Sequence, residues 1–152
     1  MTETKTIADT AEEKLLSAWL HLSLTVRGNR VLSGLTLNEA AICHFRDISD
    51  SAGLTASQLC DATKLLKSQM NRELNALESR GAIERNADPF DKRRILIRLT
   101  NQGRLDYYKE HSRVLRIFQA INDDLGEEEM ARLAKNLHRA TQVADKIIQE
   151  EF

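Results

Sequence analysis

Proline, glycine, cysteine and aromatic residues are all scarce in this sequence. Its 152 residues include one proline and six glycines, and aromatic side chains make up 5%. So few turn formers and rings argue against an all-β fold and favour a mainly α-helical protein. The length suits one domain, or one compact fold with extensions.

Targeting and membrane segments are also missing from the pattern. The first residues, MTETKTIADTAEEK, lack the apolar region and cleavage site of a signal peptide. No apolar run approaches the length of a bilayer span. The two cysteines, Cys43 and Cys60, form no CxxC pair and have no histidine at ligand spacing, which favours a reducing compartment. We therefore expect a cytoplasmic protein with no membrane partner.

The sequence also lacks the residue combinations typical of catalytic and metal sites. No nucleophile–base pair, phosphate-cradling loop or isolated carboxylate pair occurs, so we do not expect an enzyme. The four histidines form no HxxxH or HxxxE pair. Glu110 and His111 could join His44 around a metal, but this spacing favours no metal and no cofactor. Both cysteines are interpreted as packing residues rather than redox sensors.

The most informative stretch of the sequence runs from residue 65 to 99. One helical face is apolar, with Leu66, Met70, Leu74 and Leu77 at helical spacing. The other face carries cations and short or planar hydrogen-bonding side chains: Lys67, Ser68, Gln69, Asn71, Arg72 and Asn75. Such side chains make bidentate contacts with bases and hydrogen bonds with phosphates. This face is predicted to read DNA.

A β-hairpin is predicted directly after this helix. Gly81 ends the helix, and two short runs, 82–85 and 95–99, flank a polar loop that holds the proline. Before the helix, Thr36 and Glu39 form one capping box, and Thr55 and Gln58 form another. The helix that Thr36 begins has a predicted inward face: Leu37, Ala40, Ala41, His44, Phe45 and Ile48. The order predicts a winged helix-turn-helix.

Charge supports this interpretation modestly. Residues 53–100 hold nine basic and six acidic side chains, a net charge of +3, within a chain of net charge −1. A positive module in an otherwise acidic chain is typical of a local phosphate footprint.

Amphipathic helices are predicted on both sides of the module. One covers residues 10–27, one follows a cap at Thr100, and the last begins after Gly126. The last has a narrow stripe typical of a helix–helix seam: Met130, Leu133, Leu137, Ala140, Ala144 and Ile147. A homodimer would bury these stripes and place two reading helices on one face of the duplex. The alternative is an extended core within one chain.

The hairpin tip contains Asp91 and Arg93, two residues apart. In an extended arm their side chains would lie on the same side, so the carboxylate could hold the guanidinium for a groove or a phosphate. Lys92 and Arg94 add charge to this tip. An ordinary surface ion pair, worth about 0–1 kcal/mol, is the alternative.

At these residues the sequence resembles the MarR family of bacterial transcriptional regulators. LTASQL, KSQMNRELNALESRGAIER and DPFDKRRILIRLTNQGR match the family's signature in order and spacing over residues 35–104. Its parts are L-E-x-x-G ending the reading helix, D-x-R in the wing, and L-T-x-x-G opening the next helix. The resemblance implies a homodimer on a pseudo-palindromic operator, with Arg93 in the minor groove. It also implies modulation by a small ligand, often phenolic, or by thiol oxidation.

Two positions depart from that signature. Lys64 stands where the family often has Gly or Asn, and Leu66 stands where it has a capping Ser. We expect Lys64 to adopt a positive φ, at about 1 kcal/mol, and the reading helix to begin without its side-chain cap.

The expected organisation is therefore a mainly α protein in three parts. Residues 1–34 form an N-terminal dimerisation helix with 1–10 disordered, 35–100 the winged helix-turn-helix domain with its β-hairpin wing, and 101–152 the C-terminal dimerisation helices. An aromatic or anionic effector would lie in a pocket between Trp19, His21, Arg27, Tyr107 and His111, which could instead simply pack helices. The rival functions are a protein-interaction module and a ligand-independent architectural DNA-binding protein.

Overall fold

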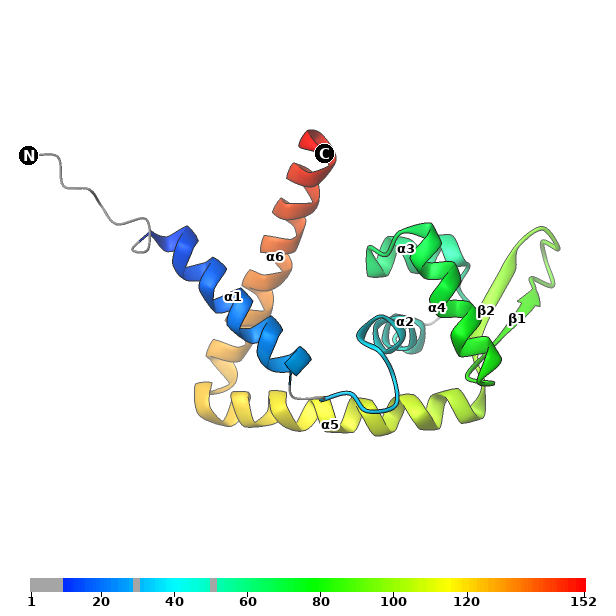
Figure 1. Ribbon diagram of the computed structural model, residues 1–152, viewed down its shortest axis with the longest axis horizontal. Coiled ribbons are helices and arrows are strands. Elements are labelled where there is room, and N and C mark those ends of the chain that lie inside the picture. Colours follow the sequence, from blue (N-terminus) through cyan, green and yellow to red (C-terminus); the bar gives the residue numbers. More distant parts are fainter. Residues whose placement is uncertain (1–9, 29–30, 50–51) are drawn as a thin grey trace, which may run out of the picture. The chain divides into compact units, whose positions relative to one another are not determined.

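The computed structural model describes residues 10–28, 31–49 and 52–152. Within them the chain forms six α-helices and one hairpin (Figure 1): α1 (Ala11–Gly28), α2 (Leu37–Asp47), α3 (Ala56–Thr63), α4 (Lys67–Ser79), β1 (Ile83–Ala87), β2 (Ile95–Leu99), α5 (Asn101–Leu125) and α6 (Glu127–Glu151). They belong to two compact units, residues 1–111 and 112–152. The order confirms the predicted winged helix-turn-helix with flanking helices. The first strand, β1, ends at Ala87, two residues beyond the predicted run 82–85.

Both predicted capping boxes are present. The Thr36 hydroxyl accepts from the Glu39 N–H at 3.1 Å, and the Glu39 carboxylate accepts from the Thr36 N–H at 2.8 Å. Thr55 and Gln58 exchange the equivalent bonds at 3.2 and 2.9 Å. These bonds satisfy N–H groups that have no partner within the helix, so the sequence itself fixes where α2 and α3 begin.

The core lies among α2, α3, α4, the hairpin and the start of α5. Its fully buried side chains include Ile42, Leu59, Met70, Leu74, Leu77 and Ile97. β1 and β2 pair antiparallel with Arg85 opposite Ile97. Leu54, before α3, adds a bridge to Ile97, whose N–H donates to the Leu54 carbonyl at 2.7 Å. The bridge attaches the hairpin to the helix-turn-helix.

The predicted inward face of α2 is partly wrong. Leu37 and Ile48 are largely exposed, whereas Glu39, Ile42 and Cys43 are buried. A carboxylate can occupy the core here because the Thr36 N–H and the Arg80 guanidinium both donate to it. Hydrophobic periodicity could not reveal this, since the partner lies 41 residues away.

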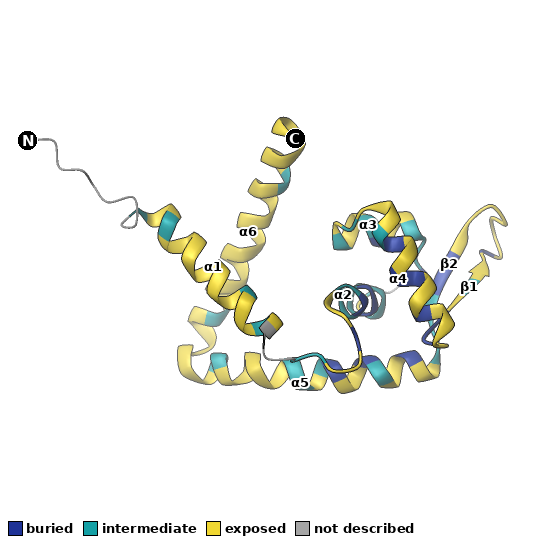
Figure 2. Ribbon diagram, viewed as in Figure 1, coloured by how far each residue is buried: buried dark blue, intermediate teal, exposed yellow. Residues whose placement is uncertain are grey.

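The long helices are much less buried (Figure 2). In α5 the buried residues are Gly103, Tyr107 and Glu110, all in its first three turns, and in α6 no residue is buried. None of the helices in the described residues combines the length and the apolar character that a bilayer span requires.

Candidate nucleic-acid interface

α4 presents one face to the core and the other to solvent. Met70, Leu74 and Leu77 are fully buried. Of the predicted DNA-reading residues, Lys67, Ser68, Asn71, Arg72 and Asn75 are exposed, and Gln69 is half-buried. The structure therefore brings five of the six side chains together on the helix face that the core does not use, whereas Gln69 lies at the edge of that face. Their alternation with the buried set follows from the 3.6-residue period of the helix.

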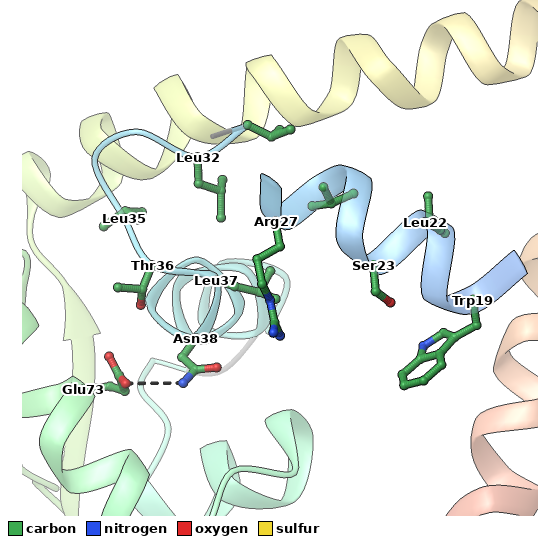
Figure 3. A pocket seen from close by; sticks show the side chains of 12 residues that line it. Trp19, Leu22, Ser23, Arg27, Leu32, Leu35, Thr36, Leu37, Asn38 and Glu73 are labelled. Carbon is green, nitrogen blue, oxygen red and sulfur yellow. Dashed lines mark hydrogen bonds between the residues drawn. The ribbon is translucent and has the colours of Figure 1, made fainter. Parts of the chain in front are cut away.

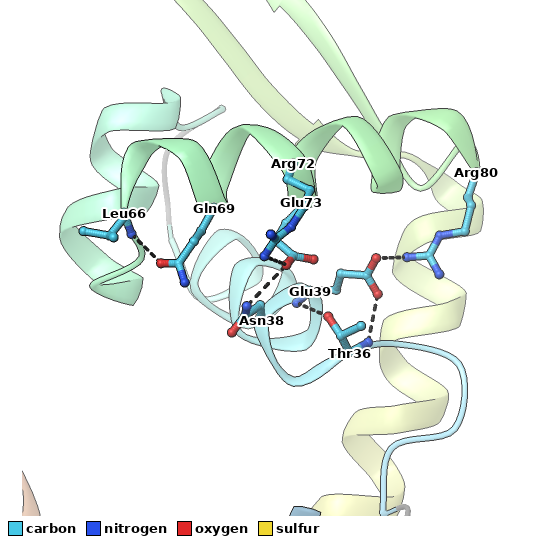
Figure 4. Close-up of polar contacts among 8 residues, drawn as sticks. All are labelled: Thr36, Asn38, Glu39, Leu66, Gln69, Arg72, Glu73 and Arg80. Carbon is cyan, nitrogen blue, oxygen red and sulfur yellow. Dashed lines mark hydrogen bonds and ion pairs between the residues drawn. The ribbon is translucent and has the colours of Figure 1, made fainter.

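The start of α4 has the unusual geometry expected from the sequence. Lys64 ends α3 in the left-handed region, with φ of 60°. Leu66 precedes α4 and supplies no side-chain cap. Instead the Gln69 side-chain oxygen accepts from the Leu66 N–H at 3.0 Å (Figure 4). The Gln69 oxygen is thus occupied by its own helix, which leaves its NH₂ group as the side that can face a base.

One side chain of the hairpin reaches the exposed face of α4. Arg85, on β1, donates from its NH₂ group to the Asn75 side-chain oxygen at 2.7 Å. Its Nε lies 3.0 Å from the Glu78 carboxylate. The Asn75 amide is therefore held in one orientation, with its own NH₂ group left to donate. Sequence analysis did not identify Arg85 as a functional residue. The sequence showed only a basic residue in the short run after Gly81, and the pairing of Arg85 with Ile97 came from the structure.

The hairpin tip differs from the expected extended arm. Residues 91–94 form a turn, in which the Asp91 carboxylate accepts from the backbone N–H of Arg93 at 3.0 Å. No ion pair of the Arg93 guanidinium occurs within the described residues. The paired guanidinium is that of Arg94, 3.7 Å from the Asp88 carboxylate. Neither of the two alternatives for Asp91 and Arg93, a fork or a surface ion pair, is formed, because a carboxylate two residues earlier in a turn meets the backbone N–H first. Lys92 and Arg93 remain exposed.

A cavity of about 670 Å³ lies between α1, the segment before α2, and α4. Its lining is mostly apolar, with a few polar groups: Trp19, Leu22, Ser23, Val26, Arg27, Val31, Leu32, Leu35, Thr36, Leu37, Asn38 and Glu73. Figure 3 shows Trp19 and Arg27 on α1, and Glu73 bonded to Asn38. The size falls in the range of small-molecule sites, about 300–1,000 Å³.

Only two of the five predicted pocket residues line this cavity. Trp19 and Arg27 do, whereas His21 is exposed on α1 and does not. Tyr107 and His111 belong to a separate cluster around His44. The Tyr107 hydroxyl lies 2.7 Å from the His44 Nδ1, and burial raises the pKa of Tyr107 to about 12. Tyr107 is thus a packing residue that holds α5 against α2.

Three polar contacts connect residues 34–39 with α4 and with Arg80, and Figure 4 shows two of them. Glu73, on the inner side of α4, accepts from the Asn38 amide at 3.3 Å. Arg80, just after α4, pairs with Glu39 and donates to the Gly34 carbonyl at 3.3 Å. A change in the segment from Gly34 to Glu39 would therefore act directly on α4.

Both cysteines pack in or against the core, as the sequence analysis expected. Cys43 is buried, and Cys60 is half-buried. Burial, with the nearby Glu39 carboxylate, raises the pKa of Cys43 to about 12, so this thiol is protonated at neutral pH. Among the described residues, no three His, Cys, Asp or Glu side chains gather as a metal site would require.

Comparisons with known proteins agree with this geometry. The sequence model of the MarR family matches residues 33–94. The transcriptional regulator HosA of Escherichia coli O111:H- is 31% identical over 110 residues, which span 72% of this chain and 74% of HosA.

Solved structures give the same fold. The PcaV transcriptional regulator of Streptomyces coelicolor, in complex with its natural ligand, matches with a TM-score of 0.73 and 22% identity, over 90% of this chain and 96% of PcaV. The transcriptional repressor CouR, bound to a 23-mer DNA duplex, matches with a TM-score of 0.72 and 21% identity, over 93% and 99%.

Proposed function

This chain belongs to the MarR family of transcriptional regulators, and we propose that it is a ligand-responsive repressor that binds a pseudo-palindromic operator as a homodimer in the cytoplasm. The observation that carries the proposal is the exposed face of α4. It presents hydrogen-bonding and cationic side chains on a helix whose other face is fully packed. A repressor of the same fold has been solved on duplex DNA.

The proposed DNA contacts divide into base readers and phosphate contacts. Asn71, Arg72 and Asn75 read base edges in the major groove, together with the free NH₂ group of Gln69. Lys67 and Ser68, at the first turn of α4, contact phosphates. In the wing, Lys92, Arg93 and Arg94 supply positive charge to the minor groove, and Asp91 shapes the turn that presents Arg93.

Exposed apolar surface supports the homodimer. Leu15, Trp19 and Leu22 on α1 are each more than half exposed, and α6 has no buried residue although its apolar stripe runs nearly its whole length. Monomeric proteins rarely expose such continuous apolar surface. We therefore assign residues 1–34 and 101–152 to dimerisation and 35–100 to DNA binding.

The cavity beside α1 is the proposed effector site. Its apolar wall would accept an aromatic ring, and Arg27 would attract a carboxylate or phenolate. A ligand that moves Asn38 away from Glu73 would act on α4 itself. The proposed effector is therefore a small aromatic acid.

Site selection from a random duplex library at two salt concentrations tests the main proposal. We expect an inverted repeat whose half-sites are about one helical turn apart. Arg93→Ala should flatten the salt dependence of log K by about one unit of slope. Asn71→Ala should instead lose about 1–3 kcal/mol at particular base positions. Salt-dependent binding without a motif would identify an architectural protein, and no binding at either salt would favour a protein-interaction module.

The effector can be tested through tryptophan fluorescence. Trp19 is the sole tryptophan of the sequence and lines the cavity, so its emission reports this site. We expect benzoic and hydroxybenzoic acids to change its emission and to weaken DNA binding, while the corresponding neutral amides do so less. Arg27→Ala should remove that preference for the acids. Equal response to acids and amides would contradict the anionic class.

A further inference from the structure

One aromatic side chain stands out at the tip of the wing. Phe90 is 99% exposed, although it lies in a short loop between two paired strands. It contributes nothing to the core, and within the described residues it makes no aromatic ring contact. The ring is therefore not needed to build the core, and its whole surface is open to a partner.

The loop around Phe90 is held in one conformation. The Asp88 N–H donates to the Arg94 carbonyl at 2.9 Å, and the Arg94 N–H donates to the Asp91 carbonyl at 2.9 Å. The Asp88 carboxylate accepts from the Phe90 N–H at 2.9 Å. Pro89 restricts the backbone immediately before the ring. The ring is therefore presented from a rigid turn, and little conformational entropy of the backbone is lost when it binds.

The surroundings of the ring indicate what it contacts. Lys92 and Arg93 are exposed on the same loop, between β1 and β2. Asp88 is buried and paired with Arg94, and Asp91 accepts a backbone N–H, so both nearby carboxylates are engaged within the loop. An exposed ring beside free cations fits a polyanion with apolar surfaces between its charges. Duplex DNA has this chemistry, since stacked bases lie between phosphate backbones.

We propose that Phe90 is a wedge that enters the minor groove beside Arg93 and partly unstacks one base step. The inference rests on the proposed function, because it requires the wing to bind DNA. Apolar side chains that enter base steps from the minor groove kink the duplex toward the major groove. Pyrimidine–purine steps unstack most easily, so the operator should prefer TA or CA at the step beneath the tip. That preference involves no hydrogen bond to a base.

The chain offers a control outside the proposed DNA contacts and the dimerisation segments. Ile48, at the end of α2, is 60% exposed. Phe90→Ala and Ile48→Ala each remove an exposed apolar side chain, so neither should change the melting temperature. The probe is the duplex recovered by the site selection, with a fluorescence pair at its ends to report bending and 2-aminopurine at the step beneath the tip.

Phe90→Ala should weaken binding at least about 5-fold, the lower end of what one stacked aromatic contributes. It should also abolish the bend and the 2-aminopurine signal and relax the TA or CA preference. The salt slope should stay unchanged, because no cation is removed. Phe90→Leu should retain part of the bend, and Ile48→Ala should behave as the wild type.

Several outcomes would overturn the wedge. If the Phe90→Ala protein binds and bends the duplex as the wild type does, the ring does not touch DNA and is free for another partner. If Phe90→Ala weakens binding but the wild type leaves the duplex straight and its bases stacked, the ring contacts the wall of the groove instead. A wild-type protein that binds no duplex would remove the proposed function and this inference together, whereas the first two outcomes leave the proposed function intact.

Discussion

Replacing Gly103 with alanine should destabilise the protein strongly, against the usual trend in helices. Gly103 lies in the first turn of α5, where alanine normally gains about 1 kcal/mol over glycine. Here an added Cβ would lie 1.8 Å from the carbonyl oxygen of Ala82 and 2.6 Å from its carbon. No side-chain rotation relieves this contact, because both atoms belong to the backbone that leads into β1.

The magnitude follows from what must move. Relieving the clash displaces the Ala82 carbonyl by more than about 1 Å, at a strain of roughly 1–3 kcal/mol or more. The displacement also breaks the bond from the Thr100 N–H to that carbonyl, 3.0 Å long, which contributes about 1 kcal/mol. After the propensity gain, the net loss is about 1–3 kcal/mol, equivalent to a melting temperature about 2–12 °C lower.

Denaturant and thermal unfolding of Gly103→Ala measure this loss. Gly34→Ala is the control, because its Cβ would lie 3.2 Å from the Glu110 side-chain oxygen, a contact that a shift of a few tenths of an ångström relieves. We expect the control to change stability by less than about 1 kcal/mol. A Gly103→Ala protein as stable as the wild type would refute the close approach of α5 to the Ala82 backbone.

Three further predictions follow from buried or paired groups. Burial raises the pKa of Cys43 from 9.0 to about 12, so the thiol of the unfolded chain ionises at a lower pH than that of the native protein. The free energy of unfolding should therefore fall between about pH 9 and 12. Urea titrations of Cys43→Ala should show a weaker dependence of this free energy on pH over that range. Arg80→Met leaves the Glu39 carboxylate buried without its cation. Because Arg80 is half-exposed, we expect the free energy of unfolding to fall by about 2–3 kcal/mol. A double-mutant cycle with Glu39→Gln should show that the effects of the two substitutions are not additive. Arg85→Ala releases the Asn75 amide and should broaden base preference in site selection while the melting temperature changes little; an unchanged preference would remove Arg85 as a positioning residue.

The local features of this protein were accessible from the sequence because short-range rules govern them. The capping boxes at Thr36 and Thr55 fix two helix starts, and Gly81 ends α4 with φ of 70°, as its position predicts. Lys64 adopts the positive φ that its place between two helices requires. These signals depend on residues within four positions of each other. Together with the family signature, they were sufficient for the fold and for the exposed face of α4.

Contacts between distant segments were decided by tertiary structure. Glu39 enters the core because Arg80 reaches it, Asn75 is oriented by Arg85, and the cavity is lined by Glu73 of α4 rather than by Tyr107. Each depends on backbone positions set by packing many residues away. The partner of a side chain depends on which groups lie within reach in the folded structure and on whether a nearer donor already occupies its acceptor. The sequence could therefore determine which groups were available and where helices begin, but only the packed structure determined which groups meet.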